Sequence, residues 1–557
     1  MKLETFFKHF DLLAEAPNGV QKLRELILDL AVRGKLVPQD KNDEPAAVLL
    51  ERIKKEKERL VKEKIQKVRT TSKIDNSEIP FELPKNWMWV NLDSYVLIVM
   101  GQSPDSTYYN NHKKGLPFYQ GKSDFNNLYP TPRVWCEIPL KIAEENDILI
   151  SVRAPVGSTN ICQEKSCIGR GLAALRSIDN TNNFYLLYFL RAFEKKISEM
   201  GVGSTFKAIS KTNLETFKIA VPPLNEQKRI VTKVDELMKL CDELEARQKK
   251  KQETRILINN AALNKLLTAE TPETFTKNWQ RISDNFDILY SAPENIGKLR
   301  QAILQLAVMG KLVPQNANDE PAAVLLERIK KEKERLVKEG KIKKEKSLPA
   351  IKDDEIPYDL PIGWECCYIS ELAIKVTDGE HITPTRTPSG HYLLSARNIK
   401  EEGIILDNVD YVPESEFYRI RKRCNPDKDD ILISCSGSVG RIAIVDKDDT
   451  YVMVRSVALL KLFKDNINSK YLAYILKSLM VQNQIIEKSK TSAQANLFLG
   501  KIKEIKVVLA PLNEQKRIVT KVDKLMKLCD ELETKLTQTQ TEREKIINAA
   551  VKQLLTV

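Results

Sequence analysis

Few residues of this chain are arranged as chemistry requires, so the first question is whether any catalytic motif is present. No G-x-x-x-x-G-K-[ST] phosphate loop occurs in the 557 residues, which argues against ATP hydrolysis by that route. The stretch GRGLAA at 169–174 fits a G-x-G-x-x-A dinucleotide-binding pattern. No strand–helix–strand unit follows it, so the pattern favours a strand and a turn instead. Nothing in the sequence is arranged for catalysis.

Metal-binding and nucleophilic chemistry have equally little support. The four histidines stand at 9, 112, 381 and 391, too few and too scattered to predict a histidine metal site or triad. None of the nine cysteines has a paired C-x-x-C spacing, and Cys366 and Cys367 are adjacent, which is poor geometry for one metal ion. NPDK at 425–428 shares two residues with the Asn-Pro-Pro-aromatic loop of adenine methyltransferases but lacks the second proline and the aromatic.

Recognition chemistry is better represented, in two long polar stretches. One is GQSPDSTYYNNHKKGLPFYQGKSDF at 101–125, and the other is TDGEHITPTRTPSGHYLLSARN at 377–398. Both are rich in side chains that donate and accept hydrogen bonds. Loops on a rigid scaffold are where recognition residues usually lie, so we expect binding rather than catalysis here.

The overall charge points to a polyanionic partner. Net charge is +13, charged residues make up 30% of the chain, and hydrophobic residues make up 42%. A basic balance suits nucleic acid, although a ribosomal factor or an RNA enzyme would fit equally well. No apolar run is long enough for a signal peptide or a membrane span, so we expect a soluble, reduced, cytoplasmic protein.

The elements that position these loops are duplicated. GKLVPQDKNDEPAAVLLERIKKEKERLVKE at 34–63 recurs at 310–339 with changes only at 40/316 and 41/317. PLNEQKRIVTKVDELMKLCDELE at 223–245 recurs at 511–533, with Lys524 in place of Glu236. Weaker echoes link EIPFELPKNW to EIPYDLPIGW, and NDILISVRAPVG to DDILISCSGSVG. Two nearly identical frames thus enclose two divergent inserts, which implies a pseudo-two-fold arrangement.

The block at 223–245 predicts a long helix with a narrow apolar seam. Its seam residues follow a heptad spacing and are Ile230, Val234, Leu237, Cys241 and Leu244, repeated at Ile518, Val522, Leu525, Cys529 and Leu532. A helix over 225–268 would be about 65 Å long. So narrow a seam needs a partner helix, and its own repeat is the natural candidate. An ordinary amphipathic helix on a globular core is the alternative.

The block at 34–63 predicts the end of a short helix and then a second helix that begins at Pro45. Between 51 and 69 there are nine basic residues against four acidic ones. Most of these charges fit a solvated helix face. The excess could also lie along phosphates or contact a partner subunit.

Together these residues identify a family. PPLNEQKRIVTKVDELM and APLNEQKRIVTKVDKLM, each following a divergent insert, and AVRGKLVPQ and AVMGKLVPQ resemble the conserved regions of the DNA-specificity subunit of type I restriction–modification systems. The resemblance covers essentially the whole chain. It implies that each insert is a target-recognition domain that reads one half of a split DNA site, while the conserved helices hold the two domains at a fixed distance. Starting with a conserved helical segment amounts to a circular rearrangement of the usual order.

The expected fold is mixed α/β. Two α/β target-recognition domains are separated by long antiparallel, coiled-coil-like conserved helices, with an internal pseudo-two-fold repeat. The expected domains are an N-terminal helical region (1–77), the first recognition domain (78–221), a central helical region (222–354), the second recognition domain (355–510) and a C-terminal helix (511–557).

Reading base edges requires forked donors and amides, which directs attention to particular loop residues. The candidates in the first domain are Gln102, Tyr108, Tyr109, Lys113, Lys114, Tyr119, Gln120 and Lys122, and in the second domain Thr377, His381, Thr385, Arg386, Ser395, Arg397 and Asn398. Two later loops add Ser204, Thr205 and Lys207, and Thr491, Ser492, Gln494 and Asn496. No catalytic or metal-binding residue is expected.

The resemblance also implies the partners. These are double-stranded DNA, two methyltransferase subunits and restriction–translocase subunits, and S-adenosylmethionine, ATP and Mg²⁺ are expected only in those other subunits. A stand-alone bipartite DNA-binding protein without enzyme partners is the alternative. A nuclease or methyltransferase in its own right is a third possibility, which would need a catalytic motif that the sequence lacks.

Overall fold

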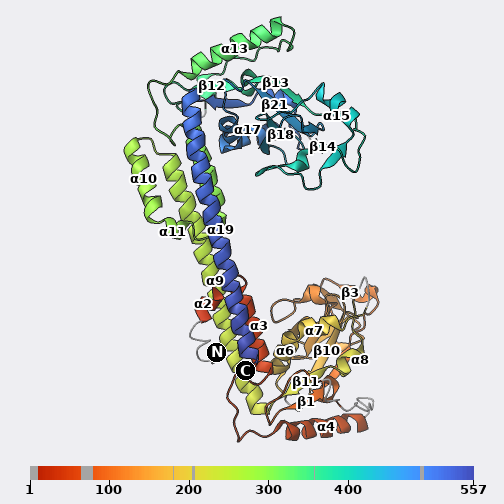
Figure 1. Cartoon of the computed structure of the whole chain (residues 1–557). Helices are drawn as coiled ribbons and strands as arrows, with labels where there is room; N and C mark the ends of the chain where they lie inside the picture. The colour runs from red at the N-terminus through yellow and green to blue at the C-terminus, as the bar shows by residue number, and fades with distance from the viewer. Residues whose placement is uncertain are drawn as a thin grey trace. The chain divides into compact units, whose positions relative to one another are not determined.

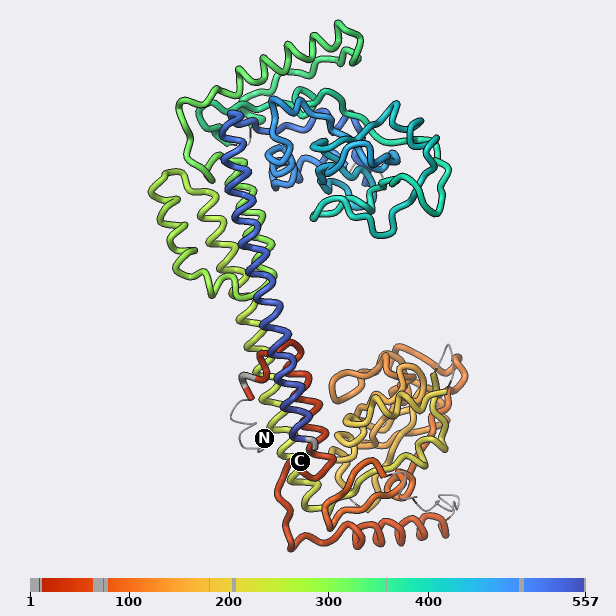
Figure 2. Tube along the Cα trace, in the orientation of Figure 1, coloured from red at the N-terminus to blue at the C-terminus, as the bar shows by residue number. Residues whose placement is uncertain are grey.

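The computed structural model describes residues 10–63, 74, 79–179, 181–202, 207–356, 358–489 and 495–556. The chain forms two compact units: unit 1 consists of residues 1–251 and 539–557, and unit 2 of residues 252–538. Two long helices, α9 (Leu224–Leu267) and α19 (Leu512–Thr556), contribute to both units. Each unit therefore combines a sheet-containing domain with helices from distant parts of the sequence (Figure 1, Figure 2).

Unit 1 contains two main sheets. The antiparallel sheet has the order β2 (Val96–Met100), β10 (Leu172–Ser177), β7 (Ile148–Ser151), β8 (Thr159–Ile161). The second sheet has the order β3 (Tyr109–Asn110), β5 (Val134–Cys136), β4 (Leu116–Tyr119), β9 (Ser166–Ile168), β6 (Ile142–Ala143). In it β4 and β9 run parallel, with Phe118 opposite Cys167. All four residues of β7 are buried, which explains why its sequence, ILIS, shows no polar alternation.

Unit 2 repeats this plan. Its antiparallel sheet has the order β13 (Ala373–Asp378), β21 (Val457–Leu462), β18 (Ile431–Ser434), β19 (Ile442–Ile444). A three-stranded sheet has the order β17 (Asp410–Val412), β14 (His391–Leu394), β20 (Tyr451–Met453), again with one parallel pair, β14 with β20. A short hairpin pairs β15 (Ile399–Lys400) with β16 (Gly403–Ile404).

A two-stranded ribbon joins each domain to its helices. In unit 1 it is β1 (Met88–Asn91) with β11 (Lys218–Val221), and in unit 2 it is β12 (Glu365–Tyr368) with β22 (Lys506–Leu509). Both ribbons are antiparallel, so the chain enters and leaves each domain at neighbouring points.

Helices surround the sheets and form the frame. In unit 1 they are α2 (Phe10–Ala14), α3 (Gly19–Val32), α4 (Ala46–Lys62), α5 (Leu92–Tyr95), α6 (Asn183–Ala192), α7 (Glu194–Glu199) and α8 (Lys211–Glu215). In unit 2 they are α10 (Pro272–Asp284), α11 (Phe286–Leu289), α12 (Pro293–Val308), α13 (Ala322–Lys338), α14 (Ile369–Leu372), α15 (Glu414–Arg421), α16 (Ser469–Lys477), α17 (Leu479–Ser489) and α18 (Leu499–Lys503). Among the described residues, no helix is both long enough and apolar enough to cross a bilayer.

The seam of α9 is buried as the heptad spacing predicts, and in α19 Ile518, Val522 and Cys529 are buried while Leu525 and Leu532 are partly buried. Ile230, Val234 and Cys241 of α9 share one apolar core with α3 and with Ile547 and Leu554 near the end of α19. In unit 2 the corresponding part of α19 shares a core with α12 and with the end of α9. Each long helix therefore packs against a short helix as well as against the other long helix. The sequence predicts only the second of these partners.

The sequence repeat extends to individual contacts. Arg24 of α3 pairs with Asp242 at 2.6 Å and Glu245 at 2.8 Å, and Arg300 of α12 pairs with Asp530 and Glu533 at 2.6 and 2.7 Å. Further copies join the long helices to the loops before α4 and α13, through Arg229 with Asp43 and Arg517 with Asp319, each at 2.6 Å. Near-identical blocks thus build near-identical frames.

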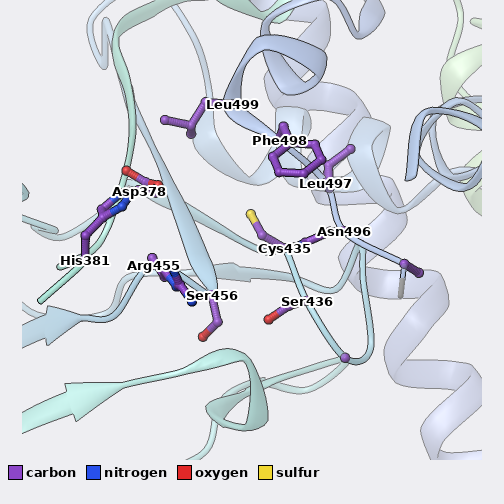
Figure 3. Close-up of a pocket in the computed structure, with 12 residues that line it drawn as sticks. Asp378, His381, Cys435, Ser436, Arg455, Ser456, Asn496, Leu497, Phe498 and Leu499 are labelled. Carbon is purple, nitrogen blue, oxygen red and sulfur yellow. Dashed lines mark hydrogen bonds and ion pairs between the residues drawn. The ribbon is translucent and has the colours of Figure 1, made fainter. Parts of the chain in front are cut away.

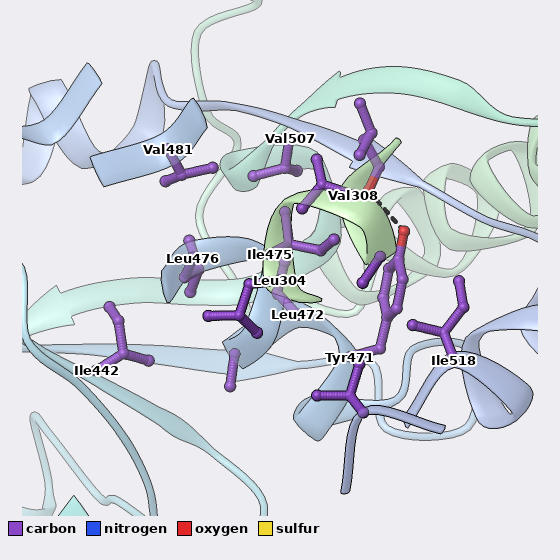
Figure 4. Packing of buried hydrophobic residues seen from close by; sticks show 14 of the residues in the cluster. Leu304, Val308, Ile442, Tyr471, Leu472, Ile475, Leu476, Val481, Val507 and Ile518 are labelled. Atoms are coloured by element: carbon purple, nitrogen blue, oxygen red, sulfur yellow. Dashed lines mark hydrogen bonds between the residues drawn. The ribbon is translucent and has the colours of Figure 1, made fainter. Parts of the chain in front are cut away.

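Within unit 2, the sheet domain is packed directly onto its frame. Figure 4 shows Leu304 and Val308 of α12 beside Leu472 and Ile475 of α16 in one apolar cluster. The Tyr471 hydroxyl, buried in the same cluster, donates to the Val508 carbonyl at 3.1 Å. This continuous apolar core joins the domain to its helices.

Helices α4 and α13 carry an excess of positive charge, and some of their lysines contribute to the fold. Lys57 of α4 donates to the backbone carbonyls of Asp93 and Val96, and burial lowers the pKa of its ammonium group to about 8. In unit 2, Lys333 of α13 donates to the carbonyls of Ser370 and Ala373 at 2.7 and 3.3 Å. One lysine of each helix therefore ties that helix to its domain instead of facing solvent.

A tryptophan–glutamate contact repeated in both units gives a stability prediction. Trp87 donates to Glu226 at 3.0 Å, and Trp364 donates to Glu514 at 3.1 Å. Both carboxylates are buried, and burial raises the pKa of each. Glu226 also accepts from Gln39 at 2.5 Å, whereas the Oε1 of Glu514 has no partner among the described residues.

We therefore expect Trp364→Phe to destabilise unit 2 by about 1.5–3 kcal/mol, the range for hydrogen bonds to charged groups. Trp87→Phe should cost unit 1 less, because Gln39 still satisfies the carboxylate. Amide hydrogen exchange at β12 and β1 in the full chain would measure the two effects. Equal acceleration in both variants would contradict this role for Gln39.

Candidate nucleic-acid interface

The GRG stretch of unit 1 is a tight turn between β9 and β10, as the sequence favours, and three other loops bond to this region. The backbone N–H of Gln102 donates to the Ile168 carbonyl at 3.0 Å. Gly169 donates to the Tyr119 carbonyl at 2.8 Å, and Val152 donates to the Gly171 carbonyl at 2.9 Å. The turn therefore connects the loops that follow β2, β4 and β7.

Glycine is required where these loops meet. A Cβ on Gly171 would lie 2.2 Å from the Gln120 carbonyl oxygen, and one on Gly101 would lie 2.1 Å from the Gly169 carbonyl oxygen. Both distances are far below van der Waals contact, so the backbones touch directly. This close approach explains Gly171 of GRGLAA without a dinucleotide.

A fifth segment, around residue 207, joins the same assembly. Ala154 donates to the Lys207 carbonyl at 3.0 Å, and Ile209 donates to the Val152 carbonyl at 2.9 Å. A β-bridge pairs Arg153 with Ala208. Lys207 therefore lies next to the loop that carries Arg153, although 54 residues separate the two in sequence.

Unit 2 has a matching assembly, in which four of these backbone hydrogen bonds recur. The backbone N–H of Glu380 donates to the Met453 carbonyl at 2.8 Å, and the backbone N–H of Val454 donates to the Leu394 carbonyl at 3.0 Å. The backbone N–H of Cys435 donates to the Ser456 carbonyl at 2.8 Å, and the Cys435 carbonyl accepts from the Leu497 N–H at 2.9 Å. These bonds match one by one those of Gln102, Gly169, Val152 and Ile209 in unit 1.

In unit 2 the assembled loops surround a cavity of about 480 Å³. Figure 3 shows its lining, which includes Asp378, His381, Cys435, Ser436, Arg455, Ser456 and Asn496. His381 Nε2 and Asp378 Oδ2 are 2.8 Å apart, and Arg423 also contacts Asp378 at 2.8 Å. Burial raises the pKa of the Cys435 thiol to about 12, which makes it a poor nucleophile.

Most candidates of the first domain are on the surface. Those with exposed side chains are Gln102, Tyr108, Lys113, Lys114, Gln120, Lys122 and Lys207. Gln102, Gln120 and Lys207 belong to the loops assembled around the GRG turn. Lys113 and Lys114 lie near β3, where the Lys113 ammonium is 5.9 Å from the Trp135 ring centre and Lys114 pairs with Glu137 at 2.9 Å.

The two remaining tyrosine candidates of the first domain are partly or fully buried and contribute to the fold. Tyr109 is partly buried and donates from its hydroxyl to the Pro104 carbonyl at 2.7 Å. Tyr119 is 2% exposed, and burial raises the pKa of its hydroxyl to about 12. The expectation that Tyr119 faces a ligand is therefore wrong for this conformation, because its side chain faces the core while only the backbone supports the turn.

The candidates of the second domain divide in the same way. His381, Thr385, Arg386 and Arg397 are exposed, and Ser395 and Asn496 are partly exposed. Arg386 and Arg397 both contact Asp410, at 3.3 and 2.8 Å, so neither guanidinium is free in this conformation.

Two candidates of the second domain are buried, contrary to expectation. Thr377 is 8% exposed within β13, and Asn398 is 0% exposed. The Asn398 side chain accepts from the Ser395 N–H and donates to the Ile405 carbonyl, each at 3.0 Å. It fixes the turn that displays Arg397 and has no surface of its own for a ligand.

Five candidates lie outside the described residues, namely Ser204, Thr205, Thr491, Ser492 and Gln494. The NPDK stretch at 425–428 lies within the described residues. Lys461 contacts its Asp427 at 2.8 Å and also the buried Asp430 at 3.0 Å. This network occupies the aspartate of that motif, so its role here is structural. The described residues contain no group of three or more His, Cys, Asp or Glu side chains placed to hold a metal ion.

Sequence reasoning missed the arginines at the assembled loops. Arg153, Arg170 and Arg455 are all exposed, and none was a candidate. A signal was available, because IGRGLAAL at 168–175 aligns with MVRSVALL at 453–460 once the repeat is followed through the inserts. The surfaces of both domains thus offer amides, hydroxyls and guanidinium groups, which are the donors and acceptors that read nucleic acid.

Comparison with known proteins shows the family of the chain. A family model described as the type I restriction modification DNA specificity domain matches residues 84–254 and 401–540. The specificity subunit of the type I restriction enzyme EcoAI of Escherichia coli is 34% identical over 540 residues, covering 92% of this chain and 90% of that protein. The EcoEI specificity subunit of Escherichia coli is 32% identical over 561 residues, covering 95% and 93%.

One solved structure is also similar in sequence. The HsdS subunit from Thermoanaerobacter tengcongensis is 43% identical, and the match covers 36% of this chain and 47% of that one, with a TM-score of 0.29. The sequence likeness to the two Escherichia coli proteins runs through nearly the whole chain. The chain belongs to the family of type I restriction enzyme specificity subunits.

Proposed function

We propose that this chain selects the DNA target of a type I restriction–modification enzyme, with each α/β domain reading one half of a bipartite target. One observation carries the proposal. Matching hydrogen bonds hold the loops of both domains in matching positions, while the side chains on those loops differ. A shared scaffold with different reading residues suits two different half-sites, so the target is asymmetric.

The exposed side chains supply the chemistry for base recognition. In the first domain Gln102 and Gln120 carry amides that suit adenine, and Arg153 carries the fork that suits guanine. The second domain has Ser436 at the position of Arg153 and Ser395 at the position of Gln120. Hydroxyls accept or donate with less preference, so the second half-site is read by another set of contacts.

The helices would set the distance between the half-sites and bind the enzyme subunits. The nearly identical frames offer two equivalent docking surfaces, so we propose two methyltransferase subunits per chain, together with restriction subunits. We place S-adenosylmethionine, ATP and Mg²⁺ in those partners and assign no catalytic step to this chain.

Co-expression with its methyltransferase subunit tests the proposal. Native mass spectrometry should show one copy of this chain with two methyltransferase subunits, and the complex should bind and methylate specific duplex DNA. Saturation at one methyltransferase would contradict the two-fold model. A chain that binds its target alone and forms no such complex would be a stand-alone DNA-binding protein.

The isolated chain should bind neither S-adenosylmethionine nor ATP, because its sequence has no pocket motif for either ligand. Titration calorimetry of the purified chain with each ligand measures this, with the methyltransferase complex as the positive control for S-adenosylmethionine. Stoichiometric binding to the isolated chain would refute the assignment of these ligands to the partners.

A further inference from the structure

One side chain in the assembled loops is the same in both domains while its neighbours differ. The matching hydrogen bonds place Arg170 of unit 1 and Arg455 of unit 2 at the same position of the same turn. Around it, Gln102 is replaced by Glu380 and Arg153 by Ser436. Lys207 is likewise replaced, by Ala495.

Both arginines are held at a defined place. The Arg170 N–H donates to the Ser103 hydroxyl at 3.2 Å, and the Arg455 N–H donates to the Glu380 carbonyl at 3.0 Å. Glu380 is itself anchored, because its carboxylate accepts from the Ile382 N–H and pairs with Arg419 at 2.9 Å. The hydrogen bond from Ile382, together with Arg419, holds the pKa of that carboxyl below its usual value, so it stays charged. The backbone at each arginine is therefore fixed from several sides, while its side chain is exposed.

Neither guanidinium forms an ion pair among the described residues. Many other arginines of the two domains are neutralised by carboxylates, among them Arg133, Arg176, Arg386, Arg397, Arg419, Arg421 and Arg423. Arg153 also lacks such a pair within the described part of the chain, but its counterpart is a serine. Arg170 and Arg455 thus form the matched pair of exposed cations, one at the centre of each assembly.

A side chain kept where the other reading residues differ should contact something that both half-sites share. In an asymmetric target the bases differ, but the sugar–phosphate backbone is the same in both halves. We propose that Arg170 and Arg455 are equivalent phosphate clamps, each binding one backbone phosphate and registering its domain on the duplex. The neighbouring residues then read bases from a fixed position. This inference rests on the proposed function.

The test compares Arg170→Ala and Arg455→Ala in the full complex with the methyltransferase. Binding is measured over a range of salt concentrations, first to a duplex carrying the mapped target and then to duplexes with each base pair changed in turn. A lost phosphate contact weakens binding to all of these duplexes by a similar factor, roughly tenfold at low salt. The slope of log affinity against log salt should become shallower by about 0.9 for each variant.

Two further variants serve as controls. Arg170→Lys and Arg455→Lys should keep most of the affinity and the slope, because a phosphate accepts a lysine contact as well. Arg281→Ala on α10 removes the same charge from an exposed site outside the assembled loops and should leave the slope unchanged.

A base-specific result would overturn the inference. If Arg455→Ala relaxes discrimination at one base pair of one half-site, or leaves the salt slope unchanged, Arg455 is not a phosphate clamp. If the unaltered complex fails to discriminate between the mapped target and the changed duplexes, the proposed function itself fails. The two failures are therefore distinguishable in the same experiment.

Discussion

Replacing residues 78–221 with the recognition domain of another specificity subunit should change the methylated sequence in one half of the target only. The other half and the spacer should remain as they were. We expect a full change of that half-site: methylation of the old half-site is lost and methylation of a new one appears. The candidate recognition loops are contained within each insert, whereas the frames are nearly identical.

The structure favours such an exchange. The chain enters and leaves the first domain through β1 and β11, with Met88 paired to Val221. A donor domain can therefore be joined at two neighbouring points. The donor should keep a tryptophan at the position of Trp87, because that side chain bonds the buried Glu226 of α9. Without it, a loss of binding would reflect damage to the frame.

Sequencing of methylated adenines in DNA from a host that expresses the chimera would give the result. The matched control exchanges residues 355–510, which should alter the opposite half-site. A change in both halves from a single exchange would show that the domains do not read independently.

The second large effect concerns the spacer. Lengthening both α9 and α19 by four residues should add about one or two base pairs between the half-sites and leave both half-sites readable. Four helical residues span about 6 Å, and they make slightly more than one turn, so the seam changes its direction only slightly. A base-pair step is about 3.4 Å. Both helices need the insertion because both contribute to both units.

Residues 247–253 of α9, which are exposed apart from the partly buried Gln248, suit the duplication, and residues 535–541 of α19 offer the matching site. An insertion in α9 alone serves as the control. The core that joins α9 to Ile547 and Leu554 would then fall out of register on one side, so binding should weaken without a clean new spacer. Methylation sites mapped for the double insertion would decide the matter. An unchanged spacer would mean that these helices are scaffold and that another part of the complex measures the distance.

The helical frame could be predicted from the sequence because its blocks occur twice in nearly identical form. The seam residues from Ile230 to Leu244 are buried, as their spacing predicts. The heptad spacing does not predict the short helix that packs against the long helices in each unit, which is α3 in unit 1 and α12 in unit 2. The contacts of α3 and α12 with the long helices join segments more than 200 residues apart, for example Arg24 with Asp242.

The site was predicted less completely, for physical reasons. Polar type alone does not distinguish a displayed side chain from one that holds a turn, so Asn398 was assigned to the surface when it is buried. Tyr119 has the right chemistry for base contact, but it is the last residue of strand β4 and faces the core. Arg170 and Arg455 are not among the sequence candidates, because their setting depends on several loops that come together only in the folded domain.

We propose that one chain specifies two unlike half-sites at a fixed distance. The most direct test expresses the chain with its methyltransferase subunit in a host without adenine methylation and then sequences the methylated adenines. We expect a single asymmetric, bipartite motif with a constant spacer, which disappears when this chain is omitted. A contiguous or palindromic motif, or methylation that persists without the chain, would contradict it.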